Sequence, residues 1–264
     1  MRARTIDGVE IHYEVAGDGP AILLVHGIAD SSADWDGIPD RLAEDHTVVT
    51  LDLRGHGQSS LAEDYSSLVM VQDVLTVLEA TGAEAPLLGG HALGAVVVSL
   101  AAIQIPCRGV VNVDQALKFD FFLATIQALE DELRTGDFAG AMREIFDAVD
   151  GDLTPEPLRS RLHENRVTIH PEVVLGVWAL TLRSTADEVN AMTGVVGNQI
   201  TVPYLAIYGT DLGPEYPAWL AERIHTTVYE HWEGAGHYPH LVDPDRFVDR
   251  IRAFERTLGP APSS

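Results

Sequence analysis

Short runs of apolar and β-branched residues alternate along the chain with longer stretches in which apolar residues recur three and four positions apart. The short runs predict strands, and the longer stretches predict amphipathic helices. The predicted strands cover residues 9–15, 21–26, 47–53, 85–88, 109–113, 203–208 and 226–232. Because these runs are apolar on both sides and are separated by helices, they predict a parallel sheet that helices cover on both faces.

The alternation stops between about residue 119 and residue 196. Strand patterns are missing there, and helical patterns follow one another over residues 121–133, 138–149, 157–166 and 173–182, with turn residues at 150–152 and 169–171. We therefore expect a core made of residues 1–118 and 197–264, and an inserted helical lid made of residues 119–196, which we call the lid segment. Proline and serine near residues 259–264 predict a frayed end.

Composition narrows the classes of protein that this chain can represent. Its 264 residues are 46% hydrophobic, which suits one large domain with a full core. With 17 Lys and Arg against 40 Asp and Glu, the formal net charge is −23, which argues against nucleic acids and acidic membranes as partners. The single cysteine, Cys107, excludes an internal disulfide. The amino-terminal segment has no signal-peptide pattern, so we expect a cytoplasmic protein that begins at Met1.

The segment Gly-His-Ala-Leu-Gly at residues 90–94 carries the most information. It follows a predicted strand and begins a predicted helix, and its glycines match the spacing of the nucleophile elbow G-x-S-x-G. Glycines are needed there because the turn is so tight that side chains two residues from its apex would collide with neighbouring backbone. The apex, however, is Ala92 and not serine.

Three further motifs accompany this elbow: Val-His-Gly-Ile at residues 25–28, Asp-Leu-Arg-Gly-His-Gly-Gln-Ser at 52–59, and Gly-Ala-Gly-His-Tyr-Pro-His at 234–240. In this order and separation, the four motifs resemble those of the α/β-hydrolase superfamily, in particular its lid-bearing serine esterases and lactonases. The resemblance covers nearly the whole chain. It implies an α/β-hydrolase fold, with a mostly parallel eight-stranded sheet flanked by helices and an inserted helical lid.

The resemblance also implies roles for single residues. His237 would be the base that removes a proton from the nucleophile and later protonates the leaving alcohol. The backbone N–H groups of Ile28 and Leu93 would stabilise the oxyanion. Two carboxylates remain open as the acid that orients the base. Asp211 lies one residue earlier than the family pattern places it, and Asp114 ends the strand 109–113, where some relatives carry the acid.

Ala92 leaves more than one interpretation open, because a methyl group cannot attack a carbonyl carbon. In the first, alanine replaces the serine of an active enzyme, and the chain holds its substrate without turnover. In the second, the protein resembles the cofactor-independent dioxygenases of the superfamily, in which a His-Asp pair acts as a base without a nucleophile. In the third, the fold serves a binding protein that is not catalytic. We favour the first, because the other parts of an acyl-transfer site are retained.

The composition of the lid segment indicates the class of substrate, because the segment is rich in large apolar side chains. A mostly apolar pocket suits a hydrophobic ester or lactone better than a sugar or a peptide. Residues expected to line this pocket come from the motifs and from the lid segment: His26, Gly27, His91, Tyr238, Phe119, Phe122 and Trp178. We expect no cofactor and no metal, because none of the histidines has a metal-site spacing such as H-E-x-x-H. A homodimer is compatible with the sequence.

Overall fold

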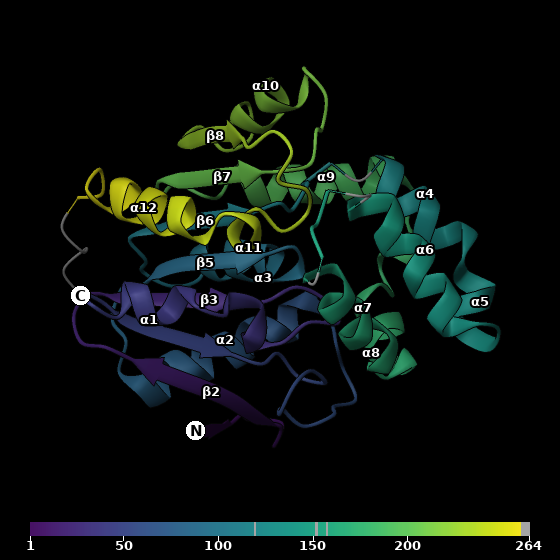
Figure 1. Cartoon of the computed structure of the whole chain (residues 1–264), viewed down its shortest axis with the longest axis horizontal. Helices are drawn as coiled ribbons and strands as arrows, with labels where there is room; N and C mark the ends of the chain where they lie inside the picture. The colour runs from purple at the N-terminus through teal and green to yellow at the C-terminus, as the bar shows by residue number, and fades with distance from the viewer. Residues whose placement is uncertain (119, 151–152, 157, 260–264) are drawn as a thin grey trace.

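The computed structural model describes residues 1–118, 120–150, 153–156 and 158–259 (Figure 1). Eight strands form one sheet in the order β1-β2-β4-β3-β5-β6-β7-β8. They are β1 (Arg2–Arg4), β2 (Glu10–Ala16), β3 (Ala21–Val25), β4 (Thr47–Leu51), β5 (Leu87–His91), β6 (Gly109–Val113), β7 (Tyr204–Tyr208) and β8 (Thr227–His231). Strand β2 pairs antiparallel with β1 and β4, and the pairs from β4 to β8 are parallel. The predicted mostly parallel, eight-stranded sheet is confirmed.

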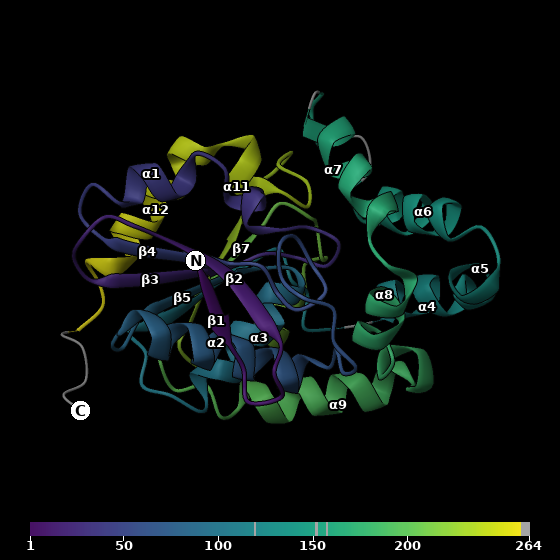
Figure 2. The same ribbon diagram turned by 90° about the horizontal axis from the view of Figure 1, so that it is seen from below.

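Helices cover both faces of this sheet, as predicted. Figure 2 shows α1, α11 and α12 on one face and α2 and α3 on the other. Their bounds are α1 (Ile38–Leu42), α2 (Ser67–Thr81), α3 (Leu93–Ala102), α10 (Tyr216–Ala221), α11 (Pro239–Val242) and α12 (Pro244–Glu255), with the short 3₁₀ helix η1 at Ser32–Trp35. The central strands β3, β5, β6 and β7 are buried along their whole length. The end predicted to fray lies, from residue 260 onward, outside the described residues.

The lid segment contributes the helices between β6 and β7. They are α4 (Asp120–Ala128), α5 (Glu130–Thr135), α6 (Phe138–Asp150), α7 (Leu158–Thr168), α8 (Pro171–Val177), η2 (Thr181–Arg183) and α9 (Ala186–Gly197). The helices α4 to α8 lie beyond one end of the sheet in both views, whereas α9 runs back alongside α3 (Figures 1 and 2). Of the two turns predicted there, residues 151 and 152 lie outside the described residues. At the other, His170 caps α8 and Pro171 begins it. Within the described chain, no helix is long and apolar enough to cross a membrane.

The structure differs from the sequence pattern at four places. The predicted helix 173–182 is one of them, since α8 ends at Val177 and the 3₁₀ helix η2 follows at Thr181–Arg183. Strand β1 was not predicted, because only Ala3 of its three residues is buried. Strand β5 continues to His91 instead of ending at residue 88. Its glycine at position 89 reads as a break, yet a Cβ there would lie 2.7 Å from Leu24 Cδ2, so close strand packing explains the glycine. The predicted helix 121–133 is two helices, because the backbone at Leu129 leaves the helical region.

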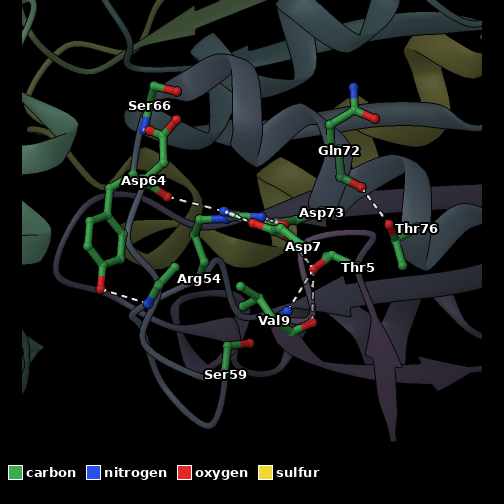
Figure 3. A network of polar contacts seen from close by, with 12 residues as sticks. Thr5, Asp7, Val9, Arg54, Ser59, Asp64, Ser66, Gln72, Asp73 and Thr76 are labelled. Atoms are coloured by element: carbon green, nitrogen blue, oxygen red, sulfur yellow. Dashed lines mark hydrogen bonds and ion pairs between the residues drawn. The ribbon is translucent and has the colours of Figure 1, made fainter.

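The turn after β4 is anchored by Arg54, whose side chain is completely buried (Figure 3). Its guanidinium donates two hydrogen bonds to the carboxylate of Asp73 on α2, from Nε at 2.8 Å and from Nη2 at 2.6 Å. Its Nη1 donates to the Asp7 carboxylate at 2.9 Å and to the Asp64 carbonyl at 3.1 Å. Arg54 therefore joins the amino-terminal hairpin, the turn after β4 and helix α2.

We expect the substitution Arg54→Met to lower the free energy of unfolding by about 3–5 kcal/mol, because it leaves the Asp73 carboxylate buried without its partner. Urea unfolding measures the difference. Arg2→Met is the matched control, since the Arg2–Glu10 pair is half-exposed and such pairs contribute about 0–1 kcal/mol. Equal losses for the two variants would contradict the role of Arg54.

Candidate active site

Ala92 is the apex of a sharp turn between β5 and α3, and its backbone is strained. Its φ of 45° and ψ of −118° lie in a region that side-chain-bearing residues rarely adopt. The flanking glycines make the turn possible: a Cβ on Gly90 would lie 2.3 Å from the carbonyl carbon of Gly94, and a Cβ on Gly94 would lie 2.1 Å from the Val25 oxygen. The turn therefore has the geometry of a nucleophile elbow, and it presents a methyl group.

His237 lies in the loop after β8 and is paired with Asp114, which follows β6. The His237 Nδ1–H donates to Asp114 Oδ2 at 2.7 Å. The Asp114 carboxylate also accepts hydrogen bonds from the amides of Gly209 and Thr210 at 2.7 and 2.9 Å and from Thr210 Oγ1 at 2.7 Å. Four donors thus fix one carboxylate, and that carboxylate fixes the orientation of the imidazole.

The electrostatics of this pair suit a neutral imidazole beside an ionised carboxylate. Burial lowers the pKa of His237 from its ordinary value, and repulsion from His91 lowers it further, while the hydrogen bond to Asp114 acts in the opposite direction. Burial alone would raise the pKa of Asp114, but His237 and the Thr210 donors outweigh it and lower that pKa. With Nδ1 donating to Asp114, Nε2 carries the lone pair of the neutral ring.

Asp211, the other carboxylate considered from sequence, is engaged elsewhere. Its Oδ1 accepts a hydrogen bond from the Gly213 amide at 2.9 Å, and the residue is exposed. The neighbouring Thr210 contacts Asp114 instead. The geometry brings Asp114, and not Asp211, to the imidazole of His237.

The loop after β3, residues 26–30, lies against the elbow, and we call it the oxyanion loop. A Cβ on Gly27 would lie 3.3 Å from the Ala92 Cβ and 3.1 Å from His91 Nδ1, so a side chain there would crowd the elbow. His26 is fully buried: its Nε2 accepts from the Leu53 amide at 3.0 Å, and its Nδ1 lies 2.6 Å from the Gly27 carbonyl oxygen. His26 thus ties the loop to the turn after β4 and contacts protein on both sides of its ring.

The amides of Ile28 and Leu93 were the expected oxyanion donors. Leu93 is the first residue of α3, where N–H groups have no acceptor within the helix. Within the described part of the chain, neither amide donates a hydrogen bond. Ile28 follows Gly27 and Leu93 follows Ala92 in the chain, and Gly27 and Ala92 lie against each other. The two N–H groups without an acceptor among the described residues therefore lie beside the elbow.

Beside the elbow, three buried side chains gather: His91 at the end of β5, Asp34 in η1 and His240 in α11. His91 Nδ1 lies 3.0 Å from Asp34 Oδ2, and His240 Nε2 lies 3.6 Å from Asp34 Oδ1. One ligand atom from each lies within 4.8 Å of the others, a spacing that a metal ion could bridge. The His91–Asp34 distance is that of a hydrogen bond, so a shared proton already accounts for this contact.

A second polar chain connects the lid segment to the oxyanion loop. Arg166 of α7 is buried, and its Nη2 donates to Tyr238 Oη at 2.8 Å. Tyr238 in turn donates to Asp30 Oδ2 at 3.0 Å. Burial, together with the charge of Asp34, raises the pKa of Asp30 to about 7. Through Tyr238, which follows His237 in the chain, the lid segment and the oxyanion loop are therefore joined by hydrogen bonds.

Of the lid residues expected to line the pocket, Phe119 lies outside the described residues. Phe122 and Trp178 meet edge to face, with ring centroids 5.9 Å apart, and Trp178 is buried. This contact packs α4 against the turn after α8.

Sequence patterns missed Asp34, Thr210, Asp30 and Arg166 as members of the site. Thr210 sits beside Asp211 in the Gly-Thr-Asp segment, so a search for hydroxyl donors near the acid could have found it. Asp34 and Arg166 belong to no recognisable motif, and only the fold brings them to the elbow.

Comparison with known proteins agrees with this geometry. The model of the alpha/beta hydrolase family matches residues 22–250. The chain belongs to the alpha/beta hydrolase family. It is similar to the Mycobacterium tuberculosis protein Rv2715, with 28% identity over 99% of this chain and 82% of that protein.

Solved structures of this family extend the comparison. The esterase RhEst1 from Rhodococcus sp. ECU1013 is 26% identical with a TM-score of 0.79, over 98% of this chain and 99% of that chain. Est816, an N-acyl homoserine lactone degrading enzyme, is 21% identical with a TM-score of 0.77, over 96% and 100% of the two chains. Membership of the alpha/beta hydrolase family supports an enzyme of the hydrolase type.

Proposed function

We propose that the site binds hydrophobic carboxylic esters or lactones and is built for Ser-His-Asp hydrolysis, with residue 92 as the nucleophile position. One observation carries this proposal. His237 Nδ1 lies 2.7 Å from Asp114 Oδ2, and this pair lies beside a turn whose backbone has the conformation of a nucleophile elbow. The esterase and lactone-degrading relatives support the same substrate class.

In the proposed reaction, His237 Nε2 takes the proton of a hydroxyl at position 92 as its oxygen attacks the acyl carbon. The amides of Ile28 and Leu93 stabilise the oxyanion, and His237 then returns the proton to the leaving alcohol. Water repeats the sequence and releases the acid. Because Ala92 has no hydroxyl, we propose that this chain is an inactive serine-to-alanine form that binds its substrate without an acyl-enzyme step.

A crystal of the chain soaked with an intact hydrophobic ester, such as 4-nitrophenyl butyrate, tests the proposal. We expect the carbonyl oxygen to face the amides of Ile28 and Leu93, and the carbonyl carbon to lie against the Ala92 methyl group. An ester bound elsewhere, with this corner of the site unoccupied, would contradict it.

Ala92 also favours a second candidate, in which the His237–Asp114 pair acts as a base without a nucleophile. An acid that follows β6 suits this chemistry, which resembles that of cofactor-independent dioxygenases. Oxygen consumption by the unmodified chain with a quinolone-type substrate would favour this candidate. A chain that binds esters but consumes no oxygen would favour the hydrolase site.

A further inference from the structure

His91 makes two contacts that together determine how many protons its ring carries. The side chain has no exposed surface. Its Nδ1 lies 3.0 Å from Asp34 Oδ2, and its Nε2 lies 2.9 Å from the backbone carbonyl oxygen of His237. A carbonyl oxygen and an ionised carboxylate can only accept hydrogen bonds. Both ring nitrogens must therefore donate, and an imidazole that donates from both nitrogens is an imidazolium cation.

The charged and titratable groups around His91 agree with this state. Burial would raise the pKa of Asp34, but attraction to the His91 charge, together with its side-chain contacts with His91 and His240, lowers it below its ordinary value, so Asp34 is an anion. Burial opposes a charge on His91, yet Asp34 outweighs it and the pKa of His91 is raised. The pKa of His240 is lowered by burial, as is that of His237. The cluster therefore holds one cation and one anion between two neutral histidines.

Other groups face the same space from neighbouring elements. Asp30 of the oxyanion loop attracts His91, and its own pKa of about 7 leaves it only partly ionised at neutral pH. His26 of the same loop is neutral, because burial lowers its pKa. Arg166 of α7 acts on His237 and Asp30 but is not among the main influences on His91. Asp34 remains the principal counter-charge.

We propose that His91 is a protonated positioning residue, whose Nε2–H holds the backbone carbonyl of His237 and whose positive charge keeps the His237 imidazole in its neutral, basic form. The two rings have centroids 4.7 Å apart, close enough for the charge on one to oppose protonation of the other. The catalytic meaning of this arrangement rests on the proposed function, in which His237 is the base.

A metal ion is the main competing explanation for a cluster of one carboxylate and two imidazoles. A metal would need a deprotonated nitrogen on His91, because a ligating imidazole donates its lone pair. It would also separate His91 from Asp34, which lie at hydrogen-bonding distance. The protonation state of the two His91 nitrogens therefore distinguishes a proton from a metal.

Nitrogen-15 NMR of the unmodified chain, with labelled histidine and signals assigned from His91→Gln and His237→Gln, tests the proposal directly. We expect both His91 nitrogens to remain protonated above the ordinary histidine pKa of about 6.5, and His237 to titrate below it. A His91 nitrogen that loses its proton below that ordinary pKa, or a stoichiometric metal ion found by elemental analysis, would overturn the proposal.

The variant Asp34→Asn removes the counter-charge and keeps the shape of the side chain. We expect His91 to lose its proton at a lower pH in this variant, and the pKa of His237 to shift upward because the neighbouring positive charge is gone. Asp36→Asn is the control, since Asp36 lies two residues away on the surface and should shift neither value. An unchanged His237 pKa in a folded Asp34→Asn variant would show that His91 acts only by packing.

None of these measurements uses enzyme activity, so they stand even if the proposed hydrolysis fails. Conversely, a neutral His91 in a chain whose Ala92→Ser variant hydrolyses esters would overturn this proposal and leave the proposed function intact. In an active Ala92→Ser background, Asp34→Asn should move the acid limb of kcat/KM to higher pH by the same amount as the His237 shift measured by NMR.

Discussion

Replacing Ala92 with serine is expected to raise the rate of hydrolysis of an activated ester such as 4-nitrophenyl butyrate by about 10⁴- to 10⁶-fold, the range that separates serine hydrolases from variants without their nucleophile. The backbone at residue 92 already has the elbow conformation, so the substitution adds one oxygen without a change of fold. Release of 4-nitrophenol under saturating ester measures the effect.

Ala102→Ser is the matched control, because it adds the same oxygen near the end of the same helix, away from the elbow. It should leave the rate at that of the unmodified chain. An Ala92→Ser variant that is folded and no faster than this control would rule out the proposed Ser-His-Asp mechanism, and the base-only candidate would then remain.

In the Ala92→Ser background, Asp114→Asn is expected to lower kcat by about 10⁴-fold. The Asp114 carboxylate accepts the Nδ1–H of His237, and a neutral amide no longer fixes that tautomer or stabilises the imidazolium that forms during attack. The rate should fall with little change in KM, because Asp114 contacts His237 and the Thr210 segment instead of the ester.

Asp211→Asn in the same background provides the comparison that separates the two carboxylates. Asp211 is exposed and caps its own loop at the Gly213 amide, so its loss should change kcat by less than about threefold. The opposite result, a large loss for Asp211→Asn and a small one for Asp114→Asn, would mean that the loop rearranges when substrate binds.

The main architecture was predictable because strand and helix periodicities differ and the central strands are apolar on both sides. The departures have physical causes. The three residues of β1 are too few to show an alternation, and the glycine at position 89 signals a break where it allows Leu24 to approach. The predicted helix 121–133 is interrupted at Leu129, where the backbone leaves the helical region. Leucine is a common helix residue, so the sequence gives no sign of this break.

The candidate site was predictable only where its residues belong to motifs. His237 and Ala92 stand in recognisable turns, so sequence could name them. The choice between Asp114 and Asp211 could not be made, because both follow strands that end at the same edge of the sheet. Asp34 lies 57 residues from His91 along the chain, and no spacing rule connects them. Contacts of this kind depend on the assembled fold.

The positive φ of residue 92 also limits which nucleophilic side chains could be engineered at this position. Branching at Cβ is poorly tolerated at positive φ, so threonine and valine would distort the turn, whereas serine, cysteine and aspartate keep an unbranched Cβ. The same scaffold could therefore be redirected toward thioester or alkyl-ester intermediates by one codon, while a threonine nucleophile would require rebuilding the loop around it.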